Sequence, residues 1–213
     1  MYEAHPSRAL SALFRVKPYQ GAAPEDAEFL FVGLDANYSA DIEQSPIFPR
    51  LLEYHEDGPA FWRRHGVHHP FLLPAYSGDG RRYHVTFAKI GFRAAQADLV
   101  SFVELLHLPT VGRSRLEPRD LERPHLQRLR EAIFAGAAKY IFVSAGVLRL
   151  METTGTFRDL LRAPVSSGAL RVLFRDSHRT VFLHLHFSNY GKFEAQLQAE
   201  AKAIAGLLQS GAV

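Results

Sequence analysis

The stretch Phe29-Leu30-Phe31-Val32-Gly33-Leu34-Asp35-Ala36-Asn37-Tyr38 decides the fold class of this chain. Its first four residues are apolar, which is typical of a short strand buried on both faces of a parallel sheet. Gly33 ends this strand, and Asp35 follows on a polar turn. Ligands of open α/β sheets bind at the carboxyl ends of the strands, so Asp35 lies where chemistry is expected. A purely structural turn is the alternative interpretation.

Apolar segments alternate with amphipathic ones along the rest of the chain. We expect further strands at 99–106, 140–146 and 180–186, an edge strand at 170–174, and helices that include 83–90, 124–138 and 192–208. This alternation predicts an α/β fold with three layers, α/β/α, around a central, mostly parallel four-stranded sheet. A length of 213 residues suits one well-filled core, so residues 1–213 are expected to form a single domain.

The composition is that of a globular protein, with 47% hydrophobic and 22% charged residues. No apolar run approaches the length of a membrane span, and the first residues lack the pattern of a signal peptide, so we expect a cytoplasmic protein without a membrane partner. Cysteine is absent, which excludes disulfides, thiolate zinc sites and cysteine-ligated iron–sulfur clusters. The net charge of +3 permits a polyanionic partner but does not require one.

Two further segments carry candidate site residues. His184 and His186 alternate onto one face of the last predicted strand, with His186 nearer its carboxyl end. Glu104 lies inside an otherwise apolar strand, and a buried carboxylate is expected to be partnered or functional. The alternative is that this strand ends earlier and leaves Glu104 in solvent. We expect the first and last strands to be parallel neighbours, so that Asp35 and His186 meet in one cleft at their carboxyl ends.

These residues give the chain a resemblance to the uracil-DNA glycosylase superfamily. Members carry a Gly-x-Asp/Asn turn after the first strand, which Gly33-Leu34-Asp35 matches, and a His-Pro-Ser-like motif after the last strand, which His186-Phe187-Ser188 matches. The segment 83–92 resembles the family's aromatic-bearing segment, and 102–110 resembles the strand that holds its base-reading residue. The resemblance covers most of residues 28–205 in order and spacing.

The resemblance implies a DNA glycosylase that flips a damaged or deaminated base into a pocket and hydrolyses its N-glycosidic bond. Asp35 would stabilise the sugar cation and orient a water, and His186 would donate a hydrogen bond to the departing base. Base binding is expected from Gly33, Leu34, Tyr83, Phe71 and Glu104, and DNA binding from Ser188, Asn189, Lys192, Arg113 and Arg115. The expected partner is DNA, duplex or single-stranded, with no cofactor and no obligate protein partner.

The chain departs from the family pattern at Ala36, Glu104 and Phe187. An ionised Glu104 accepts hydrogen bonds only, which disfavours uracil excision unless burial keeps the carboxyl protonated. Two alternatives follow. One is a catalytically inactive nucleic-acid or nucleotide-binding member of the same fold. The other is a metal-dependent hydrolase, for which His184 and His186 with His68, His69 and Asp35 supply suitable ligand types.

Overall fold

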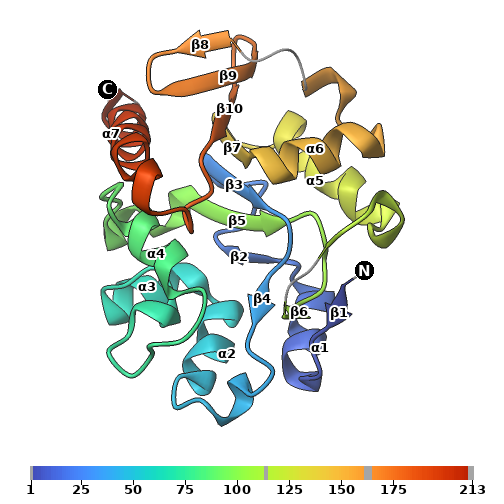
Figure 1. The fold of residues 1–213 in the computed structure, drawn as a ribbon, viewed down its shortest axis with the longest axis vertical. Helices are drawn as coiled ribbons and strands as arrows, with labels where there is room; N and C mark the ends of the chain where they lie inside the picture. The colour runs from blue at the N-terminus through green and yellow to red at the C-terminus, as the bar shows by residue number, and fades with distance from the viewer. Residues whose placement is uncertain (1, 113–114, 161–164, 211–213) are drawn as a thin grey trace.

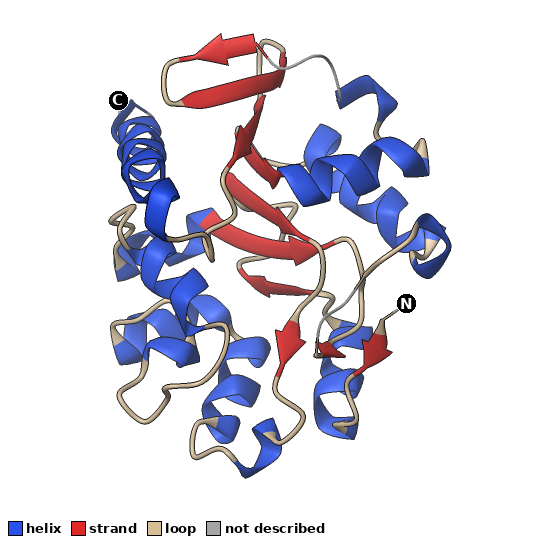
Figure 2. Cartoon of the chain, viewed as in Figure 1, coloured by secondary structure: helices blue, strands red, loops and turns tan. Residues whose placement is uncertain are grey.

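The computed structural model describes residues 2–112, 115–160 and 165–210 and shows a mixed α/β fold (Figures 1 and 2). Its main sheet has the strand order β2 (Tyr19–Gly21), β5 (Val100–Glu104), β3 (Phe29–Gly33), β7 (Tyr140–Ser144), β10 (Thr180–His184), β9 (Leu170–Arg175) and β8 (Val165–Ser167). The helices are α1 (Arg8–Val16), α2 (Phe48–Glu56), α3 (Gly58–His65), α4 (Arg81–Ala88), α5 (Arg123–Ala135), α6 (Ala145–Thr154) and α7 (Glu194–Ser210).

The main sheet is wider than the four-stranded sheet that the sequence predicts. Strands β5, β3, β7 and β10 are parallel neighbours, as the alternation with helices predicts. Antiparallel β2 extends the sheet beyond β5, and antiparallel β9 and β8 extend it beyond β10. The prediction of β9 as an edge strand is therefore wrong, because β8 pairs with its outer side. Short turns join β8 to β9 and β9 to β10, as antiparallel pairing allows, whereas β2 pairs with β5 from a distant part of the chain.

Alternating side chains of the central strands form two separate cores. Leu30 and Val32 of β3 pack with the apolar faces of α5 and α6, whereas Phe29 and Phe31 pack with residues of α3, α4 and α7. Helices therefore cover both faces of the sheet, α5 and α6 on one and α4 and α7 on the other (Figure 1). Phe31 stacks on Phe142 with ring centroids 4.7 Å apart, so the second core is largely aromatic.

A small second sheet lies beyond the carboxyl ends of β3 and β5. Its order is β1 (Glu3–Ala4), β6 (Thr110–Val111) and β4 (Asn37–Tyr38). It packs near a third core cluster that combines side chains of α1 and α2 with Phe71. The 3-10 helices are η1 (Ile42–Gln44), η2 (Pro70–Leu72), η3 (Ala94–Leu99), η4 (Pro118–Asp120), η5 (Arg158–Leu160) and η6 (Gly191–Phe193).

Strands β3 and β10 direct their carboxyl ends to the same edge of the sheet, although they are not adjacent. Strand β7 lies between them, with Val32 of β3 and Leu183 of β10 both opposite Val143. The expectation that adjacent strands carry Asp35 and His186 is therefore wrong. The described helices include none that is both long and apolar enough to cross a bilayer.

Candidate active site

A cleft of about 610 Å³ opens where β3, β5 and β10 end. Asp35 and His186, the two predicted catalytic residues, both line it, and so do five predicted base-binding residues: Gly33, Leu34, Phe71, Tyr83 and Glu104. Ser188, predicted to bind DNA, lies there as well. The strand ends that the sequence singled out therefore meet in one cavity.

Hydrogen bonds from the small sheet hold the Asp35 carboxylate. The hydroxyl of Thr110 donates to Asp35 Oδ2, and Asn37 Nδ2 donates to Thr110 Oγ1 at 2.9 Å. The same Asn37 amide donates to the carbonyl of Gly112 at 2.7 Å. Because the backbone of Thr110 also donates to the Ala36 carbonyl at 2.9 Å, the turn and β6 form one unit. This chain of donors fixes the orientation of the Asp35 carboxylate.

The hydrogen bonds of His186 determine which ring nitrogen is free to donate. Its Nδ1 lies 2.6 Å from the hydroxyl of Ser188 and accepts the Ser188 backbone N–H at 3.3 Å. A neutral imidazole that accepts at Nδ1 carries its proton on Nε2. Burial lowers the pKa of His186, while the nearby Asp35 carboxylate opposes this effect. His186 is thus a neutral donor at the mouth of the cleft.

Glu104 ends β5 directly opposite Gly33 of β3. Its carboxyl group lies over the glycine, so that a Cβ built on Gly33 would be only 1.9 Å from Glu104 Oε2. Burial, with the Asp35 charge as a smaller cause, raises the pKa of Glu104 to about 8. The carboxyl group is therefore protonated at neutral pH, so it can donate a hydrogen bond as well as accept one.

Aromatic rings form the remaining walls of the cleft. The Tyr83 ring lies 5.2 Å from the His186 ring and 5.3 Å from Phe187. Phe71, the other predicted stacking residue, is buried and stacks on Tyr76 with centroids 4.2 Å apart. Because a neighbouring ring already covers one face of Phe71, Tyr83 is the better placed residue to stack on a bound base.

Buried histidines line the cleft behind Tyr83. The rings of His69 and His84 stack 3.6 Å apart, and His68 Nε2 lies 3.1 Å from His84 Nδ1. Burial lowers the pKa of His68 to about 3 and the pKa values of His69 and His84 well below their usual range. His69 and His84 therefore add polar atoms but no positive charge to this wall, and His68 lies behind them.

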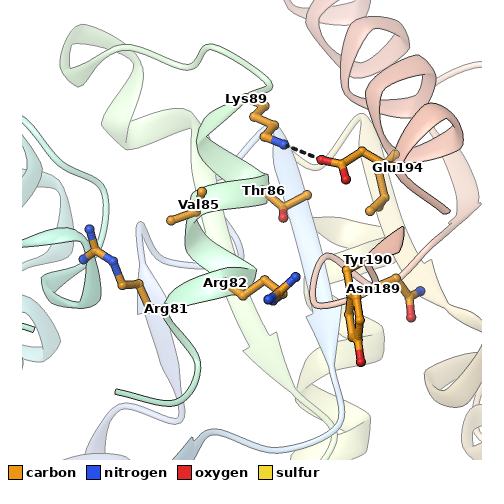
Figure 3. Close-up of a pocket in the computed structure, with 9 residues that line it drawn as sticks. Arg81, Arg82, Val85, Thr86, Lys89, Asn189, Tyr190 and Glu194 are labelled. Carbon is orange, nitrogen blue, oxygen red and sulfur yellow. Dashed lines mark hydrogen bonds and ion pairs between the residues drawn. The ribbon is translucent and has the colours of Figure 1, made fainter. Parts of the chain in front are cut away.

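A second, shallower groove of about 330 Å³ runs between α4 and the start of α7 (Figure 3). Arg82 places its guanidinium 4.6 Å from the centre of the Tyr190 ring, and Lys89 lies 3.5 Å from the Glu194 carboxylate (Figure 3). Asn189 also lines this groove. Because Ser188 lines the cleft and the next two residues line the groove, one loop joins the two cavities.

The other predicted DNA-binding residues are more dispersed. Lys192 is exposed in η6, with its ammonium 5.2 Å from the Phe193 ring, and Arg115 is exposed in the loop after β6. Neither residue lines the cleft or the groove. Arg113 lies outside the described residues.

Several residues of the site were not predicted from the sequence. They are Thr110, which holds Asp35, and Tyr38 and His84, which line the cleft; His69, also in the lining, was predicted only as a possible metal ligand. The polar residue Thr110 at the end of an apolar segment was the one detectable hint, since it lies at the same edge as Asp35. The histidines reach the cleft through long-range packing.

No three His, Asp or Glu side chains in the described part of the chain are grouped so that they could hold a metal ion. His184 is buried against Phe187, with ring centroids 4.7 Å apart, and burial lowers its pKa to about 3. The ligand set of the metal-dependent alternative is therefore not assembled among these residues. The chain matches no protein-family model and no curated protein.

Proposed function

We propose that this protein is a DNA glycosylase that binds an extrahelical base in the cleft and hydrolyses its N-glycosidic bond. The observation that carries the proposal is the convergence of the Asp35 carboxylate and the His186 donor in one cleft with the Tyr83 ring. The carboxylate would stabilise the sugar cation, the imidazole would donate to the departing base, and the ring would stack on the base. The fold type also supports the proposal, because ligands of such sheets bind at the carboxyl ends of the strands.

The chemistry requires charges of both signs to be stabilised. As the bond between the base and C1′ breaks, positive charge develops on the sugar and negative charge on the base. Asp35, held by Thr110, would stabilise the cation and accept a proton from the attacking water. The Nε2–H of His186 would donate to the base, and losing such a donor costs about 10²- to 10³-fold in rate.

The size and walls of the cleft suit a single base. A volume of about 610 Å³ falls within the range of small-molecule sites. Tyr83 would stack on the flipped base, an interaction worth about 1–3 kcal/mol in related single-strand binding. The cost of flipping is a few kcal/mol, so this contact and the hydrogen bonds at the cleft would offset it.

The test is release of free base from duplexes that carry uracil, hypoxanthine, xanthine or mismatched thymine. We expect the wild type to act on at least one duplex, and Asp35→Asn and His186→Gln to reduce the rate by about 10²-fold or more. The exposed residues Asp26 and His178 provide matched controls, Asp26→Asn and His178→Gln, that should keep full activity. Tight binding of a duplex without release of any base would instead identify an inactive binding protein.

A further inference from the structure

The Glu104 carboxyl group is placed for a role beyond binding. It lines the same cleft as Asp35 and occupies the space that Gly33 leaves open. In the part of the chain that the structure describes, this carboxyl group makes no hydrogen bond with protein. Glu104 is half-buried, and without a protein partner its carboxyl group is free to form hydrogen bonds with a molecule that enters the cleft.

Among the described residues that line the cleft, no cation would hold Glu104 as a carboxylate. No Lys or Arg belongs to the described lining of the cleft. The titratable groups that line this cavity with Glu104 are Asp35, Tyr38, His69, Tyr83, His84 and His186. Burial lowers the pKa of all three of these histidines and raises the pKa of both tyrosines. Asp35, the remaining group, contributes negative charge, which favours the protonated form of Glu104.

On the basis of the proposed glycosylase function, we propose that Glu104 is the general acid that protonates the departing base. Two carboxyl groups in one cleft but in different environments are a recurring arrangement for breaking glycosidic bonds, in which one donates a proton and the other acts as an anion. Here Glu104 would donate, while Asp35, which has Thr110 as a donor, would act as the anion.

The proton and electron balance of the step is complete. The bond between C1′ and the base nitrogen breaks, and its electron pair stays with the base. The Glu104 proton moves to a ring nitrogen or a carbonyl oxygen of the base, which leaves as a neutral molecule. Water adds to C1′ and gives its proton to Asp35. Exchange of protons with solvent then restores protonated Glu104 and ionised Asp35.

A general acid changes the class of base that the cleft can release. Bases that are stable as anions can depart without a proton donor, whereas purines and other bases that are poor anions need one. We therefore expect the substrates to include bases that are poor leaving groups as anions. Hydrogen bonding by His186 alone does not provide this range, because it leaves the charge on the base.

The test compares leaving groups of different acidity in Glu104→Gln. This variant keeps the size of the side chain and a donor but cannot transfer a proton. For a uracil or hypoxanthine duplex, we expect kcat to fall by about 10²- to 10⁴-fold, the usual contribution of general acid catalysis. For 5-fluorouracil, whose anion is more stable, the loss should be much smaller. Glu152→Gln, an exposed change in α6, is the control that should match the wild type on every substrate.

The alkaline side of the pH profile provides a second readout of the same assay. Wild-type kcat should decline as pH rises through about 8, because Glu104 then loses the proton that it donates. That decline should be absent from the residual activity of Glu104→Gln. Equal losses on uracil and 5-fluorouracil, or an alkaline decline that persists in the variant, would overturn the general-acid role while leaving the glycosylase function intact. Inactivity of the wild type on every base would reject both.

A measurement without substrate tests the protonation of Glu104 directly. A folded-state pKa above the unfolded value of about 4.5 means that wild-type stability declines as pH rises toward about 8. Glu104→Gln lacks this group, so its melting temperature should rise relative to that of the wild type over this interval. A constant difference between the two melting temperatures would show that Glu104 is ionised in the folded protein, and it would overturn the proposal.

Discussion

At the scale of single residues, the site depends on the close approach of Gly33 and Glu104 across two neighbouring strands. A side chain at position 33 would occupy the place of the Glu104 carboxyl group, since the nearest oxygen would be 1.9 Å from the new Cβ. The obstructing atoms are the end of a flexible side chain, so the Glu104 side chain can move away while the backbone stays in place. The absence of a side chain at Gly33 thus leaves the space in which the Glu104 carboxyl group lies.

We predict that Gly33→Ala separates activity from stability. The substitution displaces the Glu104 carboxyl group, and a misplacement of about 1 Å in an active site can cost about 10²-fold in rate. Unfolding free energy should change by about 1 kcal/mol or less, because the backbone of β3 keeps its pairing with β5. Chemical denaturation and base-release kinetics measure the two effects. Full activity in Gly33→Ala would show that the position of Glu104 is unimportant.

The control is Gly206→Ala in α7, where nothing lies within 4 Å of an added Cβ. Alanine is a better helix former than glycine by about 1 kcal/mol, so this variant should be at least as stable as the wild type. Its activity should be unchanged. The comparison separates the effect of adding a methyl group from the effect of moving Glu104.

Some residues of the site could be predicted from the sequence, and others could not. Asp35 and His186 each follow an apolar segment, and Glu104 interrupts one, so strand-end reasoning identifies all three. His69 and His84 reach the cleft by stacking on one another from separate segments, which leaves no pattern in either one. The protonation of Glu104 could not be predicted from the sequence either, because it depends on the burial of this side chain in the folded protein.

At the scale of elements, α7 determines how the end of β10 presents His186. Glu200 of this helix is 1% exposed, and its Oε2 accepts the backbone N–H of Leu185 at 2.8 Å. Gln196 supports the same carboxylate by donating to Oε1 at 2.9 Å. The residue before His186 is thereby anchored to a helix on one face of the sheet. Glu200 is a positioning residue in this account.

We predict that Glu200→Ala lowers both stability and activity, whereas Glu200→Gln retains most of each. Alanine leaves the buried N–H of Leu185 without an acceptor, which costs about 1–3 kcal/mol. Glutamine still offers a carbonyl oxygen to that N–H. Thermal melts and kcat for base release measure these effects. Equal behaviour of the two variants would show that the Glu200 hydrogen bond does not position His186.

The elements differ in how well the sequence predicts them. The central strands β3, β7 and β10 are continuous apolar segments, and they are found close to their predicted positions. Strands β2 and β8 have only three residues each, and the strands of the small sheet have two. Segments this short show no measurable periodicity of apolar residues, and whether they form strands depends on a pairing partner elsewhere in the chain. The width of the sheet was underestimated for this reason.

At the scale of the whole molecule, the proposed function assigns the groove beside the cleft to the nucleic-acid backbone. Arg82 of α4 and Asn189 line this groove, and the loop that carries Asn189 also carries Ser188 and His186. A base in the cleft would therefore place its neighbouring phosphates near the groove. Lys192 lies in η6, directly after this loop, and is exposed.

We predict that duplex binding weakens steeply with salt. Each phosphate that the protein neutralises contributes about −0.9 to the slope of log affinity against log salt. Arg82→Gln and Lys192→Gln should each reduce the slope by about 1, whereas Lys202→Gln on the exposed side of α7 should leave it unchanged. Fluorescence titration of a labelled duplex gives these slopes. A slope near zero for the wild type would indicate a small-molecule ligand instead of DNA.

The most direct test of the central claim requires no prior choice of lesion. DNA deaminated by nitrous acid contains several altered bases, and mass spectrometry identifies whichever free bases the protein releases from it. We expect the wild type to release free base and to leave an abasic sugar carrying one oxygen from labelled water, and Asp35→Asn to do so at a rate lower by about 10²-fold or more. If the wild type releases no more free base than Asp35→Asn, the cleft does not hydrolyse N-glycosidic bonds and the proposed function is wrong.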